Sequence, residues 1–242
     1  MEEKTLQAVW LGRTLYDTCW TLQKELLRKR QTGSIGDTLL LTEHEPVYTI
    51  GSSGNPNHVL ANNTELLVRG IPLVAVDRGG DVTYHGPGQI VGYPILDLHD
   101  YYLDLHRYLR DLEEVVIRVL LGFGLRATRH PDYTGVWMGD EKICAIGVRV
   151  SRWVTMHGFA LNVWTELAPF DRIIPCGLRE KGVTSVTREI HRPMSIEELI
   201  GPLLVEFSAV FHTPVERCSL DDLRSGRFRA TSEQPIGHLK VE

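Results

Sequence analysis

The chain has 242 residues, of which 43% are hydrophobic and 24% are charged, values typical of a soluble globular protein that buries a sizeable core. The formal net charge of -5 and the lack of a dominant Lys/Arg block give no general electrostatic reason to expect binding to nucleic acid or to a membrane. The sequence has no apolar leader, no run of 18 apolar residues and no CxxC spacing among its four cysteines, so we expect a cytoplasmic protein with free thiols.

The first half of the chain predicts a mixture of helices and strands. Apolar residues recur at three- and four-residue spacing over 14–30 and over 103–121, which predicts two amphipathic helices. The Gly-, Ser-, Asn- and Pro-rich stretch at 51–56 predicts a loop. Short apolar runs predict strands at 38–41, 47–50, 72–76 and 90–96.

The second half predicts antiparallel hairpins followed by a helix. Runs rich in β-branched and aromatic residues, separated by turn-length gaps, lie at 136–138, 143–150 and 154–163. Ser195 with Glu198 three residues later is a capping-box pattern before a helix over 196–211. We therefore expect an α+β fold of mixed sheets and packed helices in one domain over 1–218, followed by a loosely held polar tail over 219–242.

The most unusual segment is the stretch 78–89, which reads Arg-Gly-Gly-Asp-Val-Thr-Tyr-His-Gly-Pro-Gly-Gln. Glycine at this density lets the backbone turn sharply or approach another group closely, and residues such as Arg78, His85 and Gln89 supply polar contacts around it. The alternative is a turn-rich hairpin with polar residues on the surface. The GxxxxGK[ST] and GxGxxG spacings are both absent, so no phosphate loop is predicted.

Cys176 is the cysteine best placed to act as a nucleophile. It lies between a proline and a glycine, hence on a bend, and an exposed bend suits a reactive thiol. Cys19 lies on the apolar stripe of a predicted helix, Cys144 in an apolar strand and Cys218 near the polar tail. Because burial in a structural role is the common fate of a free thiol, the position of Cys176 alone leaves both roles open.

A reactive thiol needs a nearby cation or base, and Lys142 is the candidate. It opens the apolar run 143–148, where burial would favour the neutral amine and make it a usable proton acceptor. A strand-end lysine that points to solvent is the alternative. Cys144 is a rival to Cys176, because it lies two residues beyond Lys142 and hence on the same face of a regular strand.

Two histidines, His85 and His157, each precede a glycine. Either one can act as a base, contact a substrate or be a satisfied structural residue, and we favour the structural role for His157. No protease signature surrounds Cys176, and no pair of His or Cys residues has metal-ligand spacing. A Cys-His hydrolase and a metal site are therefore less favoured.

Four motifs follow one another between residues 78 and 177. They are the stretch 78–89, Lys142-Ile-Cys-Ala-Ile-Gly, His157-Gly-Phe-Ala-Leu-Asn and Pro175-Cys176-Gly177. In this order they resemble the lipoate-protein ligase B family, the octanoyl-[acyl-carrier-protein]:protein N-octanoyltransferases. The resemblance extends from roughly residue 8 to residue 215 and makes 1–218 an octanoyltransferase catalytic domain.

The resemblance implies a fold similar to the catalytic domain of biotin and lipoate ligases. It also implies that Cys176 carries an acyl thioester and that Lys142 lowers the pKa of this cysteine. Asp81 departs from the family pattern, since many members carry Gln there, and this leaves the edge of the pocket open to change. The residues implied to line the acyl pocket are Arg78, Gly79, Gly80, Asp81, Val82, Thr83, Tyr84, His85, Ala145, Ile146, Gly147, Gly158, Phe159 and Ala160.

The implied activity is transfer of an octanoyl group from octanoyl-acyl-carrier protein to a lysine of a lipoyl domain, the first step of endogenous protein lipoylation. The implied acceptors are the lipoyl domains of 2-oxoacid dehydrogenases and the glycine cleavage H protein. Neither ATP nor a metal is expected, because a thioester on Cys176 would replace a thioester of similar energy on the phosphopantetheine arm of the carrier.

Two other functions fit parts of the pattern. An ATP-dependent lipoate or biotin ligase also uses a lysine but needs no cysteine nucleophile, and the Pro-Cys-Gly bend argues against it. A non-catalytic module that binds acyl carriers or lipoyl domains would keep the pocket without thiol chemistry. The presence of both Lys142 and Cys176 argues against that module.

Overall fold

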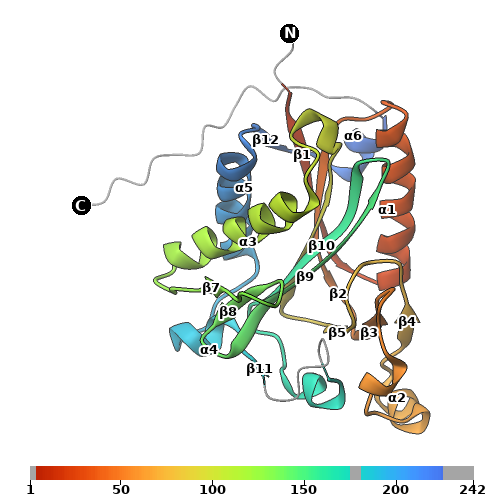
Figure 1. The fold of residues 1–242 in the computed structure, drawn as a ribbon, viewed down its shortest axis with the longest axis vertical. Helices are drawn as coiled ribbons and strands as arrows, with labels where there is room; N and C mark the ends of the chain where they lie inside the picture. Colours follow the sequence, from red (N-terminus) through yellow and green to blue (C-terminus); the bar gives the residue numbers. More distant parts are fainter. Residues whose placement is uncertain (1–3, 175–180, 226–242) are drawn as a thin grey trace.

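The computed structural model describes residues 4–174 and 181–225. Its main feature is a long mixed sheet with helices on both faces (Figure 1). The strand order in this sheet is β12-β1-β2-β6-β10-β9-β8-β7, and β11 pairs with β9 beside this path. A second, three-stranded sheet has the order β4-β3-β5.

The strands of the two sheets are mostly short, apart from five neighbouring strands in the middle of the main sheet, β1, β2, β6, β10 and β9. The main sheet comprises β1 (Leu6–Thr14), β2 (Thr38–His44), β6 (Gln89–Ile95), β7 (Thr128–Arg129), β8 (Val136–Met138), β9 (Glu141–Ser151), β10 (Val154–Asn162), β11 (Gly182–Val183) and β12 (Val215–Arg217). The smaller sheet comprises β3 (Val47–Ile50), β4 (Leu73–Ala75) and β5 (Val82–His85).

Two of the longer helices cover one face of the main sheet, and one covers the other. The α-helices are α1 (Tyr16–Gln31), α2 (Asn63–Arg69), α3 (Leu105–Gly122), α4 (Val186–Ile190), α5 (Glu197–Phe211) and α6 (Leu220–Ser225). Short 3-10 turns are η1 (Pro56–His58), η2 (Leu98–Asp100) and η3 (Ala168–Arg172). Helices α3 and α5 pack together in one hydrophobic core, while α1 and α6 pack in another core on the opposite face (Figure 1).

The helices predicted from apolar periodicity are confirmed, because each buries most of its apolar stripe against the sheet. In α1 the residues Cys19, Leu22 and Leu26 of the predicted stripe are buried, whereas Leu15 precedes the helix and is 63% exposed. Burial of a leucine contributes roughly 1.5–3 kcal/mol, so the stripe and not helix propensity fixes α1 on the sheet. Before α5, the Glu198 carboxylate accepts a hydrogen bond from the Ser195 N–H at 2.7 Å, which forms the carboxylate half of the predicted capping box.

The predicted tail begins as part of the folded domain. Its first residues form α6, and Leu223 of this helix is fully buried in the core beside α1. Residues 226–242 of the tail lie outside the described residues. In the described part of the chain, none of the helices combines the length and the apolar character needed to cross a membrane.

Candidate active site

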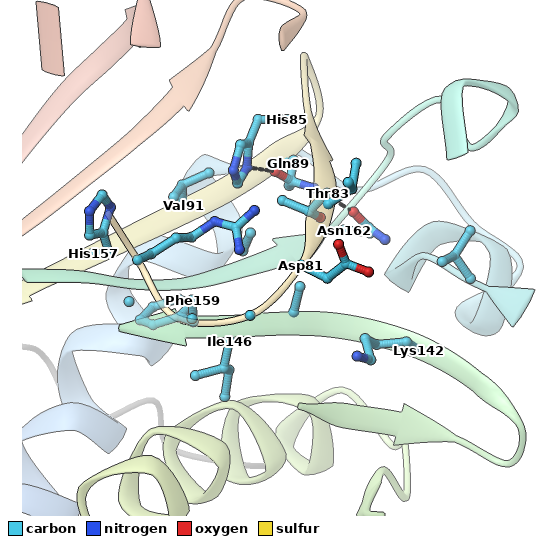
Figure 2. Close-up of a pocket in the computed structure, with 18 of the residues that line it drawn as sticks. Asp81, Thr83, His85, Gln89, Val91, Lys142, Ile146, His157, Phe159 and Asn162 are labelled. Atoms are coloured by element: carbon cyan, nitrogen blue, oxygen red, sulfur yellow. Dashed lines mark hydrogen bonds between the residues drawn. The ribbon is translucent and has the colours of Figure 1, made fainter. Parts of the chain in front are cut away.

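A pocket lies where β5 and the glycine-rich stretch meet β6, β9 and β10. Twelve of the fourteen residues implied to bind the acyl substrate line it, together with Lys142. Figure 2 shows Lys142 and His157 at opposite ends of this group, with Phe159 and Ile146 between them. The lining comprises Tyr16, Arg78, Gly80, Asp81, Val82, Thr83, His85, Gln89, Val91, Tyr93, Lys142, Ala145, Ile146, Gly147, His157, Gly158, Phe159, Ala160, Asn162, Phe170 and Val183.

The two remaining residues of that set, Gly79 and Tyr84, lie beside the pocket. The N–H of Gly79 donates to the carbonyl of Val148 at 2.8 Å, which ties the glycine-rich stretch to β9. The buried ring of Tyr84 packs against Tyr48 and Phe170 with centroid distances of 5.4 and 5.5 Å. Both residues therefore support the wall of the pocket from behind.

The glycine-rich stretch lies directly on β9 because Gly147 has no side chain. A Cβ at this position would lie 2.9 Å from the carbonyl oxygen of Gly79 and 3.2 Å from Cδ of Arg78. Arg78 is buried and donates to the carbonyl oxygen and the hydroxyl of Thr49 at 3.0 and 2.8 Å. The guanidinium thus fixes this wall of the pocket to β3. Its planar set of N–H donors is suited to making two hydrogen bonds to one partner residue.

Lys142 is held on both sides by the sheet and points into the pocket. It pairs with Trp137 of β8 and with Val183 of β11, and it is only 7% exposed. Its ammonium nitrogen lies 4.7 Å from the centre of the Trp137 ring, a cation-π contact that stabilises the charged amine. The alternative of a solvent-facing lysine is therefore wrong.

Cys144 does not share a face with Lys142, contrary to the expectation from strand alternation. Between β8 and β9 the register shifts, so that Trp137 pairs with Lys142 but Val136 pairs with Cys144. This bulge inserts one extra residue and reverses the alternation. Cys144 is consequently fully buried in the core, and burial raises the pKa of its thiol far above the usual range. A neutral, inaccessible thiol is a poor nucleophile, which removes the rival to Cys176.

Cys176 lies in the segment 175–180, outside the described residues. The chain on either side of this segment contributes Phe170 and Val183 to the lining of the pocket. Ile174, the last described residue before the segment, donates its N–H to the carbonyl of His58 at 2.7 Å. Both flanks of the segment are therefore fixed beside the pocket that holds Lys142.

The histidines of the pocket are buried and uncharged near neutral pH. Nδ1 of His85 lies 2.8 Å from Oε1 of Gln89, and burial lowers the pKa of His85 well below its ordinary value. Burial lowers the pKa of His157 to about 4, although Asp77 lies 2.7 Å from its Nε2 and opposes the shift. His157 also adopts a φ of +57° within β10, a conformation that side chains rarely take. His157 therefore has the partner expected of a structural residue, but it also lines the pocket.

His44 extends this buried cluster behind the pocket, and it yields a prediction on stability. Burial lowers its pKa to about 4, and its Nε2 lies 2.7 Å from the Tyr93 hydroxyl, with which it shares a hydrogen bond. In the unfolded chain these histidines have an ordinary pKa of roughly 6.5, so they bind protons between pH 7 and pH 5. In the folded chain they stay neutral over this range. The free energy of unfolding should thus fall as the pH is lowered from 7 to 5, by up to about 2 kcal/mol each for His44 and His157.

Urea unfolding at pH 7 and pH 5 measures this fall. His44→Gln removes one titrating group and should reduce the fall, whereas His106→Gln, at an exposed position of α3, should leave it unchanged. An equal fall in the wild type and in His44→Gln would show that His44 does not contribute to the acid sensitivity.

Asp81, the departure from the family pattern, joins the glycine-rich stretch to the loop before η1. Its carboxylate accepts from the N–H of Asn55 at 2.9 Å and forms a short hydrogen bond with Nδ1 of His58. Because His58 also accepts the N–H of Ile174, the carboxylate supports the start of the segment that contains Cys176. Asp81 thus shapes the edge of the pocket.

Eight further lining residues were not predicted as part of the pocket: Gln89, His157 and Asn162, which belong to the motifs themselves, and five others. Two of them, Val91 and Tyr93, follow Gln89 at intervals of two along β6, and Asn162 follows Ala160 in the same way along β10. Strand alternation from the motif residues could have found these three. Tyr16, Phe170 and Val183 come from distant elements and carry no local signal.

The described ranges 4–174 and 181–225 contain no group of three or more His, Cys, Asp or Glu residues that could hold a metal ion. The pocket instead combines apolar residues with a few polar groups and three charged side chains, those of Arg78, Asp81 and Lys142. This lining suits a thin apolar chain that carries a reactive group at the Lys142 end.

Comparisons with known proteins show the family of the chain. Residues 16–208 match the family model of the lipoyl protein ligase A/B catalytic domain. An octanoyltransferase of Rubrobacter xylanophilus is 53% identical over 205 residues, which cover 84% of this chain and 92% of that protein.

Two solved structures show the same fold at low sequence identity. A lipoate protein ligase from Thermoplasma acidophilum is 20% identical with a TM-score of 0.71, covering 93% of this chain and 90% of that chain. A biotin protein ligase from Aquifex aeolicus is 13% identical with a TM-score of 0.51, covering 85% of this chain and 69% of that chain. The fold expected from the motifs is thus confirmed.

Proposed function

The chain belongs to the lipoyl protein ligase A/B catalytic domain family, and we propose that it transfers an octanoyl group to a lysine of lipoyl domains through a thioester on Cys176. One observation carries the proposal. A pocket with an apolar lining holds the buried Lys142, and the chain that flanks Cys176 on both sides contributes residues to the same lining. The relative from Rubrobacter xylanophilus that is 53% identical is an octanoyltransferase.

The first half of the reaction forms the acyl-enzyme. The thiolate of Cys176 attacks the carbonyl carbon of the donor thioester, a new C–S bond forms and the bond to the donor sulfur breaks. The departing thiolate takes a proton from the ammonium group of Lys142. Backbone N–H groups of the glycine-rich stretch are suitable donors to the oxyanion of the tetrahedral intermediate.

The second half transfers the octanoyl group to the acceptor. The neutral amine of the target lysine attacks the thioester carbon, and the amine of Lys142 takes the proton that the new amide nitrogen loses. Cys176 leaves as a thiolate, which restores the starting charges on both residues. Thioester to amide is a downhill exchange, so the proposed cycle requires no ATP and no metal.

The donor in this proposal is octanoyl-acyl-carrier protein, whose phosphopantetheine arm delivers the thioester. The acceptors are lipoyl domains of 2-oxoacid dehydrogenases and the glycine cleavage H protein. The buried, neutral histidines at the His157 end suit the apolar tail of the octanoyl chain better than charged ones would, because a charge there would be desolvated by the chain.

Intact-mass spectrometry of an acceptor lipoyl domain tests this function. With octanoyl-carrier protein and no ATP, the acceptor should gain the mass of one octanoyl group. Free octanoate with ATP should give no product. Product from octanoate and ATP alone would identify an ATP-dependent ligase instead, and binding of both partners without transfer would identify a non-catalytic module.

A further inference from the structure

We infer that Glu113 of α3 is a positioning residue for Lys142, acting through the backbone of Gly135. This inference rests on the proposed function, in which Lys142 moves the protons. Glu113 does not line the pocket, and its carboxylate is fully buried beneath β8. A buried carboxylate is costly unless its oxygens are satisfied, so its partners show what it holds in place.

The Glu113 carboxylate contacts two arginines and one backbone amide. Oε2 lies 2.7 Å from Arg110 and 3.2 Å from Arg129, whose side chains are 44% and 37% exposed. Oε1 accepts the N–H of Gly135 at 2.9 Å, a bond that is itself buried. The arginines can turn toward water if the carboxylate is lost, but the buried N–H of Gly135 cannot. The amide is therefore the partner that depends on Glu113.

Gly135 in turn packs against the end of the Lys142 side chain. A Cβ at Gly135 would lie 3.3 Å from Cε and 3.4 Å from Cδ of Lys142, and 2.7 Å from the carbonyl oxygen of Cys144. The residue has a φ of +132°, which side chains rarely adopt. The bare backbone at this position thus packs directly against the aliphatic end of the Lys142 side chain.

Trp137 contacts the ammonium group of the same lysine. Its buried ring lies under the ammonium group of Lys142, and it is the direct strand partner of the lysine at the bulge. Gly135 and Trp137 are two residues apart on the same chain segment, so a carboxylate that fixes Gly135 also fixes the approach of β8 to β9. Displacement of this segment by 1 Å is enough to slow a proton transfer markedly.

Glu114 provides a matched control for Glu113. It is the next residue of α3, and it also pairs with two arginines, at 2.8 Å from Arg118 and 2.5 Å from Arg129. The oxygens of its carboxylate bond to exposed arginine side chains. Among the described residues, the N–H of Gly135 donates to Glu113 and not to Glu114. Substitution of Glu114 therefore removes ion pairs of the same kind and leaves the bond from Gly135 to Glu113 in place.

The test measures steady-state octanoyl transfer by folded variants. Glu113→Ala should lower kcat at least tenfold with KM within twofold of wild type, while Glu114→Ala should keep both parameters within twofold. Glu113→Gln, whose amide oxygen can still accept from Gly135, should recover kcat to within about threefold of wild type. A folded Glu113→Ala with wild-type kcat, or an equal loss in Glu114→Ala, would overturn the inference.

Labelling of lysines in the absence of any acyl donor gives a second readout. Reductive methylation followed by peptide mapping should modify Lys142 several-fold faster in Glu113→Ala than in wild type, relative to Lys24 of α1, and the Gln variant should match wild type. If Glu113→Ala does not fold, Glu113→Asp carries both measurements, because it keeps the charge but withdraws the oxygen from Gly135. Unchanged labelling and kcat in a folded Asp variant would overturn the inference. If labelling changes but the wild type transfers no octanoyl group, the proposed function fails and the positioning role stands.

Discussion

Replacing Cys176 with alanine should abolish the octanoyl adduct and lower the transfer rate by at least about 10³-fold, because the variant has no atom on which to form the acyl thioester. The expected measurement is the intact mass of the protein after mixing with octanoyl-carrier protein in the absence of ATP. Wild type should gain one octanoyl mass, and the alanine variant should gain none. Addition of an acceptor lipoyl domain should then discharge the wild-type adduct.

Cys144→Ala is the control for this experiment. The thiol of Cys144 is fully buried in the core and its pKa is raised by burial, so its loss should cost about 1–2 kcal/mol of stability and leave the adduct intact. Loss of the adduct only in Cys144→Ala would make Cys144 the nucleophile and would contradict the assignment of Cys176. An adduct that survives in Cys176→Ala with full transfer activity would exclude the thioester on Cys176.

The sequence predicted the elements whose burial follows a simple period. The stripe of Cys19, Leu22 and Leu26 identified α1, since every third or fourth residue of a surface helix faces the core. Three of the four motifs contribute residues to the pocket, and glycine is required in them where backbone packs on backbone, as Gly147 does against the glycine-rich stretch. At such positions the close backbone contact in the fold is what requires the glycine in the sequence motif. The fourth motif, Pro175-Cys176-Gly177, lies outside the described residues.

Other features of the site depend on long-range packing that no local pattern records. The bulge opposite Trp137 places Lys142 in the pocket and Cys144 in the core, although strand alternation puts both on one face. The turn between β9 and β10 uses Arg152 and Trp153 with φ of 50° and 62°, where a sequence rule would look for Asn-Gly. The antiparallel pairing of β9 and β10 begins directly at this turn and continues along both strands.

The expected effect of replacing Lys142 with alanine is a fall of about 10²–10⁴-fold in the rate of octanoyl transfer at pH 7. Without the cation, the thiol of Cys176 ionises near the ordinary cysteine pKa of roughly 8.5, so the pH at which acylation is half-maximal should move upward. Single-turnover acylation followed by mass from pH 6 to pH 10 measures this shift. An unchanged pH profile would exclude Lys142 from formation of the thiolate.

Lys142→Arg separates the two roles of the lysine. The guanidinium keeps the positive charge and can stack on the Trp137 ring that lies under the ammonium group, but it does not give up a proton near neutral pH. Formation of the Cys176 thiolate should therefore survive, whereas protonation of the departing donor thiolate and deprotonation of the acceptor amine should both be impaired. A pantetheine thiolate can leave without a proton, but the nitrogen of the acceptor lysine must lose a proton before the amide can form. The octanoyl adduct should therefore accumulate while transfer to the lipoyl domain stalls. Equal loss of adduct and of transfer in Lys142→Arg and Lys142→Ala would show that proton transfer from Lys142 is already required for acylation.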